Sequence, residues 1–154
     1  MGAVAMPDDI REIVESFPHK KSALLPVLHR FQRERGWISP ETMIEVGKLL
    51  DLSPAQVLEV VSFYTLFRRK PVGKYHIQVC RTTSCYLCGA FDLIRHLESR
   101  HGIRPDQVSA DGRFSLEIVE CIAYCHKAPA VQINMEFHGD VTPERMDAIL
   151  GGLT

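Results

Sequence analysis

The chain has 154 residues and a formal net charge of −1, with 18 Lys and Arg against 19 Asp and Glu. This length suits one ordinary domain or two small ones, and the balanced charge argues against nucleic acid as a partner. No apolar run reaches the roughly 20 residues that a membrane helix needs, and the N-terminus lacks the pattern of a secretory or organelle signal. We therefore expect a cytosolic protein without direct membrane insertion.

The first half of the chain has a helical pattern. A first helix is expected over residues 8–17, and apolar residues recur at helical spacing within 24–36. Two further helices are expected after Ser39 and Ser53, because each serine is followed by a proline, which favours an N-cap and a first helical residue. These elements predict a helical bundle over residues 1–73.

The second half, residues 74–154, predicts an α+β (α/β) domain. Its expected elements follow the order strand, helix, strand, strand, helix. The first helix of this half would turn Leu87, Phe91, Ile94 and Leu97 inward. The expected ranges are 74–80 (strand), 85–100 (helix), 114–120 and 130–134 (strands), 136–140 (hairpin partner) and a final helix from 142.

Four of the five cysteines form two short pairs, Cys80-x4-Cys85 and Cys121-x3-Cys125. Each pair is expected to end a strand and begin a turn, so two strand-end loops can each offer two thiolates. Disulfides are rare in the cytosol, where clustered cysteines usually indicate metal binding or catalysis. A two-iron cluster needs four ligands and prefers thiolates. We expect each pair to hold one iron, with bridging sulfides between them.

Other interpretations of the cysteines stay open at this stage. A structural zinc site would use the same sulfurs, although C-x2-C spacing is more usual there. Cys88 extends the first pair to plant-type ferredoxin spacing, but that choice leaves Cys125 without a role. Cys85 and Cys88 also form a C-x2-C motif that is compatible with thiol redox chemistry. His126 is a further candidate ligand for a mixed site.

Several segments together resemble the small two-iron subunit (NuoE type) of respiratory NADH:quinone oxidoreductase, complex I, in the thioredoxin-like ferredoxin family. The resemblance runs from about Asp8 to Leu153. The segments that carry it are Phe63-Tyr-Thr-Leu-Phe67, Pro71-Val-Gly-Lys-Tyr75, Val79-Cys80-x4-Cys85, Glu120-Cys-x3-Cys125, Ala128-Pro129 and Thr142-Pro-Glu144.

This resemblance implies a thioredoxin-like C-terminal domain with a [2Fe–2S] cluster on Cys80, Cys85, Cys121 and Cys125. It implies an electron-transfer subunit that receives single electrons from a flavoprotein subunit (NuoF type), which binds FMN and NADH. As part of that complex, which would reduce quinone, this chain would be cytoplasmic and peripheral on the cytoplasmic side of the inner membrane. The sequence has no GxGxxG motif, so no catalytic residue and no NADH turnover are expected of this chain alone.

Two features depart from the family pattern, and two other functions compete with this one. Ala123 stands where the family usually has glycine, and Cys88 lies outside the four-ligand pattern. The equivalent small subunit of an NAD-linked hydrogenase or formate dehydrogenase would carry the same motifs. A zinc-stapled interaction module is the alternative from a different functional class.

Overall fold

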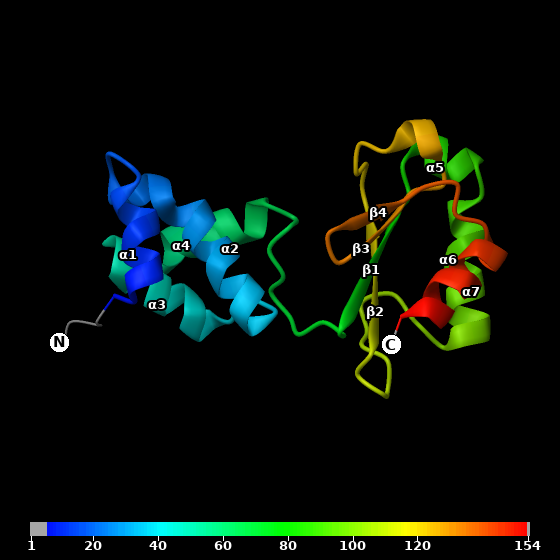
Figure 1. Ribbon diagram of the computed structural model, residues 1–154, viewed down its shortest axis with the longest axis horizontal. Helices are drawn as coiled ribbons and strands as arrows, with labels where there is room; N and C mark the ends of the chain where they lie inside the picture. Colours follow the sequence, from blue (N-terminus) through cyan, green and yellow to red (C-terminus); the bar gives the residue numbers. More distant parts are fainter. Residues whose placement is uncertain (1–5, 154) are drawn as a thin grey trace. The chain divides into compact units, whose positions relative to one another are not determined.

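The structure is a computed structural model that describes residues 6–153, so both ends of the chain, 1–5 and 154, lie outside it. It divides into two compact units, Met1–Pro71 and Val72–Thr154 (Figure 1). Each unit has its own apolar core and is described by itself. The assignment of domains to residues 1–73 and 74–154 remains a proposal.

The first unit is helical, as its apolar periodicity predicted. Its core gathers the apolar faces of all its helices, including Leu28, Val46 and Val57, which are fully buried. Gly36 ends the second α-helix in the left-handed conformation, which suits glycine. The helices are α1 (Asp8–Glu15), the 3₁₀ turn η1 (Lys20–Ala23), α2 (Leu24–Arg35), α3 (Pro40–Leu50) and α4 (Pro54–Phe63).

Helix α4 begins with a complete capping box. The Ser53 hydroxyl accepts a hydrogen bond from the Gln56 N–H, and the Gln56 side chain accepts one from the Ser53 N–H. We expect Ser53→Ala to lower the free energy of unfolding by about 1 kcal/mol, because the Gln56 N–H loses its side-chain acceptor. Chemical denaturation checks this. Ser62→Ala in the same helix is the control and should change stability by less than about 0.5 kcal/mol, since its hydroxyl only bonds the Glu59 carbonyl.

The second unit contains a four-stranded mixed sheet with the strand order β2-β1-β3-β4. Strand β1 pairs in parallel with β2 and antiparallel with β3, and β4 pairs antiparallel with β3. Helices α6 and α7 lie together on one face of this sheet (Figure 1). The fold is therefore α+β, as the sequence predicted. Its elements are β1 (Tyr75–Cys80), α5 (Thr83–Leu87), α6 (Ala90–His101), β2 (Phe114–Val119), the 3₁₀ turn η2 (Cys125–Lys127), β3 (Val131–Ile133), β4 (Glu136–His138) and α7 (Pro143–Gly152).

The prediction of a single helix over residues 85–100 is wrong. Two helices, α5 and α6, occupy this region, and Gly89 separates them with a φ of +93°. The break changes the orientation of the residues near it: Leu87 and Phe91 are exposed, whereas Ile94 and Leu97 are buried as expected. A left-handed glycine therefore allows α5 to adopt its own direction beside the first cysteine pair.

The sheet face opposite the core carries polar side chains that are buried and paired. His76 Nδ1 lies 2.9 Å from Ser115 Oγ, and His76 Nε2 lies 3.0 Å from Glu117 Oε2. Gln78 donates to the same Glu117 carboxylate at 2.9 Å. Among the described residues, no buried side-chain nitrogen or oxygen lacks a hydrogen-bond partner. None of the helices in residues 6–153 has the length and apolarity that a bilayer crossing requires.

Candidate metal centre

Parallel pairing of β1 and β2 brings the two cysteine pairs to the same edge of the sheet. Cys80 is the last residue of β1 and stands opposite Val119, the last residue of β2. Cys121 follows Val119 by two residues, so both pairs begin where neighbouring parallel strands end. The C-terminal edge of these two strands therefore assembles the candidate site from segments about 40 residues apart in the chain.

The first pair is buried. Cys80 and Cys85 are each only 1% exposed, and their side chains hydrogen-bond to each other. Cys80 also receives a hydrogen bond from the Thr82 main chain, and its sulfur lies 3.6 Å from Thr82 Oγ1, to which the thiol can donate. Cys85 lies on the short helix α5, and its sulfur receives a hydrogen bond from the Ala130 N–H. Both sulfurs thus have polar donors in an otherwise apolar setting.

The second pair is exposed, and its sulfurs are already at a separation that suits a shared metal. Cys121 Sγ and Cys125 Sγ are 3.3 Å apart, and the Ala123 N–H donates to Cys121 Sγ at 3.4 Å. For a tetrahedral metal with metal–sulfur bonds of about 2.3 Å, two thiolates lie about 3.7 Å apart. An adjustment of less than half an ångström would let both sulfurs bind one metal ion.

Electrostatic interactions connect the two pairs. The pKa of the Cys85 thiol is raised to about 11, mainly by burial, with the hydrogen bond and charge of Cys80 and the charge of Cys125 adding to the effect and the Ala130 hydrogen bond opposing it. A hydrogen bond with Cys121 raises the pKa of Cys125, with the charge of Cys80 adding to the effect. Burial and the proximity of the other sulfurs therefore both favour the protonated thiols, and a bound cation would favour the thiolates.

The pKa of Cys80 is lowered, whereas those of Cys85 and Cys125 are raised. Burial raises the pKa of this thiol, but hydrogen bonds from Thr82, Cys85 and the Ile122 N–H outweigh that effect. The Ile122 donor comes from the second cysteine loop, so it links the two pairs directly. An ion pair adds a second link at the surface, where Arg81 Nε lies 2.9 Å from Glu120 Oε1. This pair is exposed and contributes orientation more than stability.

The main-chain donors from the second loop and from Ala130 were not expected from the sequence. Within the loop between Cys80 and Cys85, Thr82 hydrogen-bonds with Cys80. A backbone N–H belongs to every residue except proline, so residue type gives no signal for it. Only the contact between the loops reveals these donors.

The two other candidate ligands are exposed. Cys88 is the C-cap residue of α5, and the sulfur contacts described above join Cys80 with Cys85 and Cys121 with Cys125. His126 lies in η2 next to Cys125, where its ring stands edge-on to the Tyr124 ring at 4.8 Å between centroids. The geometry therefore favours the four-cysteine set over a set that includes Cys88 or His126.

The family model of thioredoxin-like [2Fe-2S] ferredoxins matches residues 10–154. The chain belongs to this family. Its cofactor is therefore a [2Fe–2S] cluster, and the site fits that group: four thiols in two pairs supply the soft donors that iron–sulfur clusters use. Main-chain N–H groups directed at these sulfurs are the partners expected around such a cluster.

Relatives of known identity match over most of the chain. NADH-quinone oxidoreductase subunit 2 of Thermus thermophilus is 42% identical over 95% of this chain and 82% of its own length. A subunit of the NADH-quinone oxidoreductase of Rickettsia bellii is 43% identical over 92% of this chain and 87% of its own length.

Among solved structures, an NAD⁺-reducing [NiFe]-hydrogenase in the H₂-reduced state is similar with a TM-score of 0.72 at 26% identity. The match covers 84% of this chain but only 22% of that hydrogenase chain. The present chain therefore corresponds to one part of a longer polypeptide there.

Ala123 occupies the turn between the second pair of cysteines with a φ of +59°. This left-handed conformation costs roughly 1 kcal/mol for alanine and almost nothing for glycine. We expect Ala123→Gly to raise the free energy of unfolding by about 0.5 kcal/mol. Glycine relieves the strain of the left-handed conformation in the folded chain, and this relief exceeds the stability lost because glycine increases the entropy of the unfolded chain. Denaturation of the cluster-loaded chain checks this. Ala148→Gly in helix α7 is the control and should lower stability by about 1 kcal/mol.

Proposed function

We propose that this chain is the electron-transfer subunit of an NADH:quinone oxidoreductase complex and holds a [2Fe–2S] cluster through Cys80, Cys85, Cys121 and Cys125. One observation carries the proposal: the two cysteine pairs begin at neighbouring parallel strand ends, interact through charge, and are linked by the Ile122 N–H of the second loop, which donates to Cys80. The identity of 37–43% to subunits of NADH-quinone oxidoreductases supports the choice of complex.

In this proposal the cluster supplies the capacity to accept and release one electron at a time. The chain's own residues give it an asymmetric environment. Cys80 and Cys85 are buried and exclude water from one side, whereas Cys121 and Cys125 are exposed. The N–H groups of Ile122, Ala123 and Ala130 stabilise negative charge on the sulfurs. These donors and the degree of burial set the reduction potential.

The partner that we propose is an NADH-oxidising flavoprotein subunit of the NuoF type, which binds FMN. The exposed side of the site, around Cys121 and Cys125, provides a surface at which an electron could enter over a short distance. We further propose that this chain performs no catalysis itself and is peripheral to the membrane, on its cytoplasmic side. The sequence has no GxGxxG motif, which supports the proposal that this chain has no nucleotide site.

Iron analysis, spectroscopy and activity of the isolated chain test the proposal together. After anaerobic reconstitution we expect about two irons per chain, visible absorbance, and a paramagnetic signal after one-electron reduction. We expect no NADH oxidation until the flavoprotein subunit is added. A colourless, zinc-containing protein would refute the cluster, and NADH oxidation by the chain alone would refute its role as a pure electron carrier.

The similarity to the NAD⁺-reducing hydrogenase supports a second candidate, an equivalent position in a hydrogenase. The lower identity of 26%, compared with 42% for the Thermus relative, places it second. Purification of the native assembly distinguishes the two. Quinone-reducing membrane subunits in the same complex would support the first candidate, and a nickel-containing subunit would support the second.

A further inference from the structure

Three side chains outside the cysteine site converge between the two helices that cover the sheet. His96 and His101 come from α6, and Asp147 comes from α7. His96 Nε2 lies 2.7 Å and His101 Nε2 lies 2.6 Å from the same oxygen, Asp147 Oδ1. Both imidazoles therefore point their Nε2 atoms at one place, and one potential ligand atom from each of the three residues lies within 4.8 Å of the others.

We propose that His96, His101 and Asp147 form a binding site for one divalent transition-metal ion of the zinc class. Two imidazole nitrogens and a carboxylate oxygen are donors that zinc and its neighbours prefer. Two ligands on one tetrahedral zinc, with bonds of about 2.0–2.1 Å, lie about 3.3 Å apart. The two histidine–aspartate distances of 2.7 and 2.6 Å are shorter than this spacing, and small rotations of these partly exposed side chains would lengthen them to it.

The surroundings of the three residues keep the ligands accessible and the carboxylate charged. Their side chains are 21%, 27% and 32% exposed for His96, His101 and Asp147, so solvent can deliver an ion. In the metal-free chain, hydrogen bonds from His96 and His101 hold the pKa of Asp147 at about 2. An Nε2 atom that binds zinc would first give up its hydrogen, either to Nδ1 of the same ring or to water. Glu144, one turn earlier on α7, interacts electrostatically with His96 and Asp147 and adds negative charge.

Arg100 opposes cation binding through its charge, and it also positions the Asp147 carboxylate. Its Nε lies 3.3 Å from Asp147 Oδ2, the oxygen that the imidazoles do not use. The guanidinium weakens cation binding, but its side chain is 66% exposed and its charge is largely screened by solvent. By occupying Oδ2 it would keep the carboxylate monodentate, as hydrogen bonds to ligating carboxylates commonly do.

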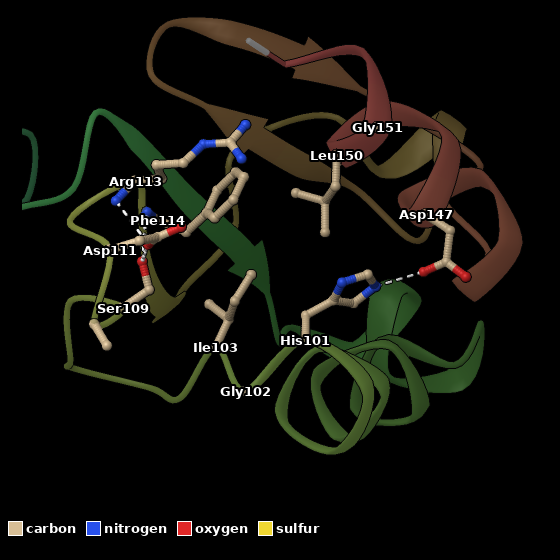
Figure 2. A pocket seen from close by; sticks show the side chains of 11 residues that line it. His101, Gly102, Ile103, Ser109, Asp111, Arg113, Phe114, Asp147, Leu150 and Gly151 are labelled. Atoms are coloured by element: carbon tan, nitrogen blue, oxygen red, sulfur yellow. Dashed lines mark hydrogen bonds and ion pairs between the residues drawn. The ribbon is translucent and has the colours of Figure 1, made fainter.

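An open cavity adjoins the site and gives room for additional ligands. His101 and Asp147 lie on its rim, and Figure 2 shows them facing each other beside Leu150. The cavity has a volume of about 530 Å³ and continues towards Arg113 and Phe114. Three protein ligands leave a tetrahedral ion with one open position, which water would fill from this cavity.

The test uses the full chain with its cluster in place, so that the four cluster cysteines are not available to the added metal. After treatment with a mild chelator, the protein is dialysed anaerobically against Zn²⁺ and analysed for both metals. We expect one zinc per chain without loss of iron, and anomalous scattering at the zinc edge located between α6 and α7. Co²⁺ should compete for the site, and Mg²⁺ should not.

Variants decide whether these residues are the ligands. His101→Asn and Asp147→Asn should each weaken zinc binding at least tenfold while cluster absorbance stays unchanged, which shows that the variants are folded. His19→Asn, an exposed histidine in the other unit, is the control and should bind zinc like the unchanged chain. The proposal is overturned if zinc binding is absent, displaces iron, or is as strong in the two ligand variants as in the unchanged chain.

Discussion

Replacement of Cys125 by serine is expected to reduce the iron content from about two per chain to well below one. A serine hydroxyl stays protonated near neutral pH and is a poor ligand for iron, which prefers thiolate. Cys125 also interacts with the charge of Cys80, and its Sγ lies 3.3 Å from Cys121 Sγ. Loss of this thiol therefore leaves the second pair incomplete. Iron analysis and visible absorbance after anaerobic reconstitution measure the effect.

Cys88→Ser is the matched control for this experiment. The two positions receive the same chemical change and both side chains are exposed, but Cys88 caps α5 outside the sulfur contacts. We expect this variant to retain its iron and absorbance. If Cys88→Ser loses the cluster and Cys125→Ser keeps it, the ligand set has plant-type ferredoxin spacing and our assignment is wrong.

Gly139→Ala is expected to destabilise the second unit and to disturb the cluster site at the same time. A Cβ atom at Gly139 would lie 2.3 Å from Lys127 Cβ and 3.0 Å from the Lys127 carbonyl oxygen. Lys127 ends the 3₁₀ turn that Cys125 begins, and the Asp140 N–H donates to this same carbonyl. Because the turn cannot yield without losing this bond, we expect a loss of about 2–3 kcal/mol in unfolding free energy and partial loss of iron.

Denaturation followed by cluster absorbance and by far-ultraviolet circular dichroism measures both effects of Gly139→Ala. Gly151→Ala is its control, since a Cβ there meets nothing within 4 Å. Gly151 lies in α7, where alanine is the better helix former, so the control should raise stability by up to about 1 kcal/mol. Unchanged stability in Gly139→Ala would mean that the turn is more adaptable than its contacts indicate.

Local patterns in the sequence predicted most elements of the fold. The N-caps at Ser39, Ser53 and Thr142 all lie where a polar cap followed by proline indicated them. These signals act within a few residues, so tertiary structure has little opportunity to override them. The break at Gly89 was missed because an isolated glycine is tolerated inside helices, and the sequence cannot show which φ it adopts.

Part of the candidate site was also predictable from local patterns in the sequence. Spacing indicated the four cysteines, but their contact depends on the parallel pairing of β1 with β2, which no local pattern encodes. The cluster of His96, His101 and Asp147 was not found at all. Its two histidines are five residues apart at the end of α6, a spacing without a metal-site signature, and Asp147 comes from a different helix.

The parallel pairing of β1 and β2 has a consequence for how the chain is held together. Once both cysteine pairs bind one inorganic centre, the polypeptide between Cys85 and Cys121, which includes α6, becomes a closed ring. Such a closure restricts the unfolded chain much as a disulfide does, and metal-binding energy becomes folding energy. Oxidative loss of the centre would therefore open the ring and loosen α6, and a damaged chain would become recognisable to proteolysis before its helical unit unfolds.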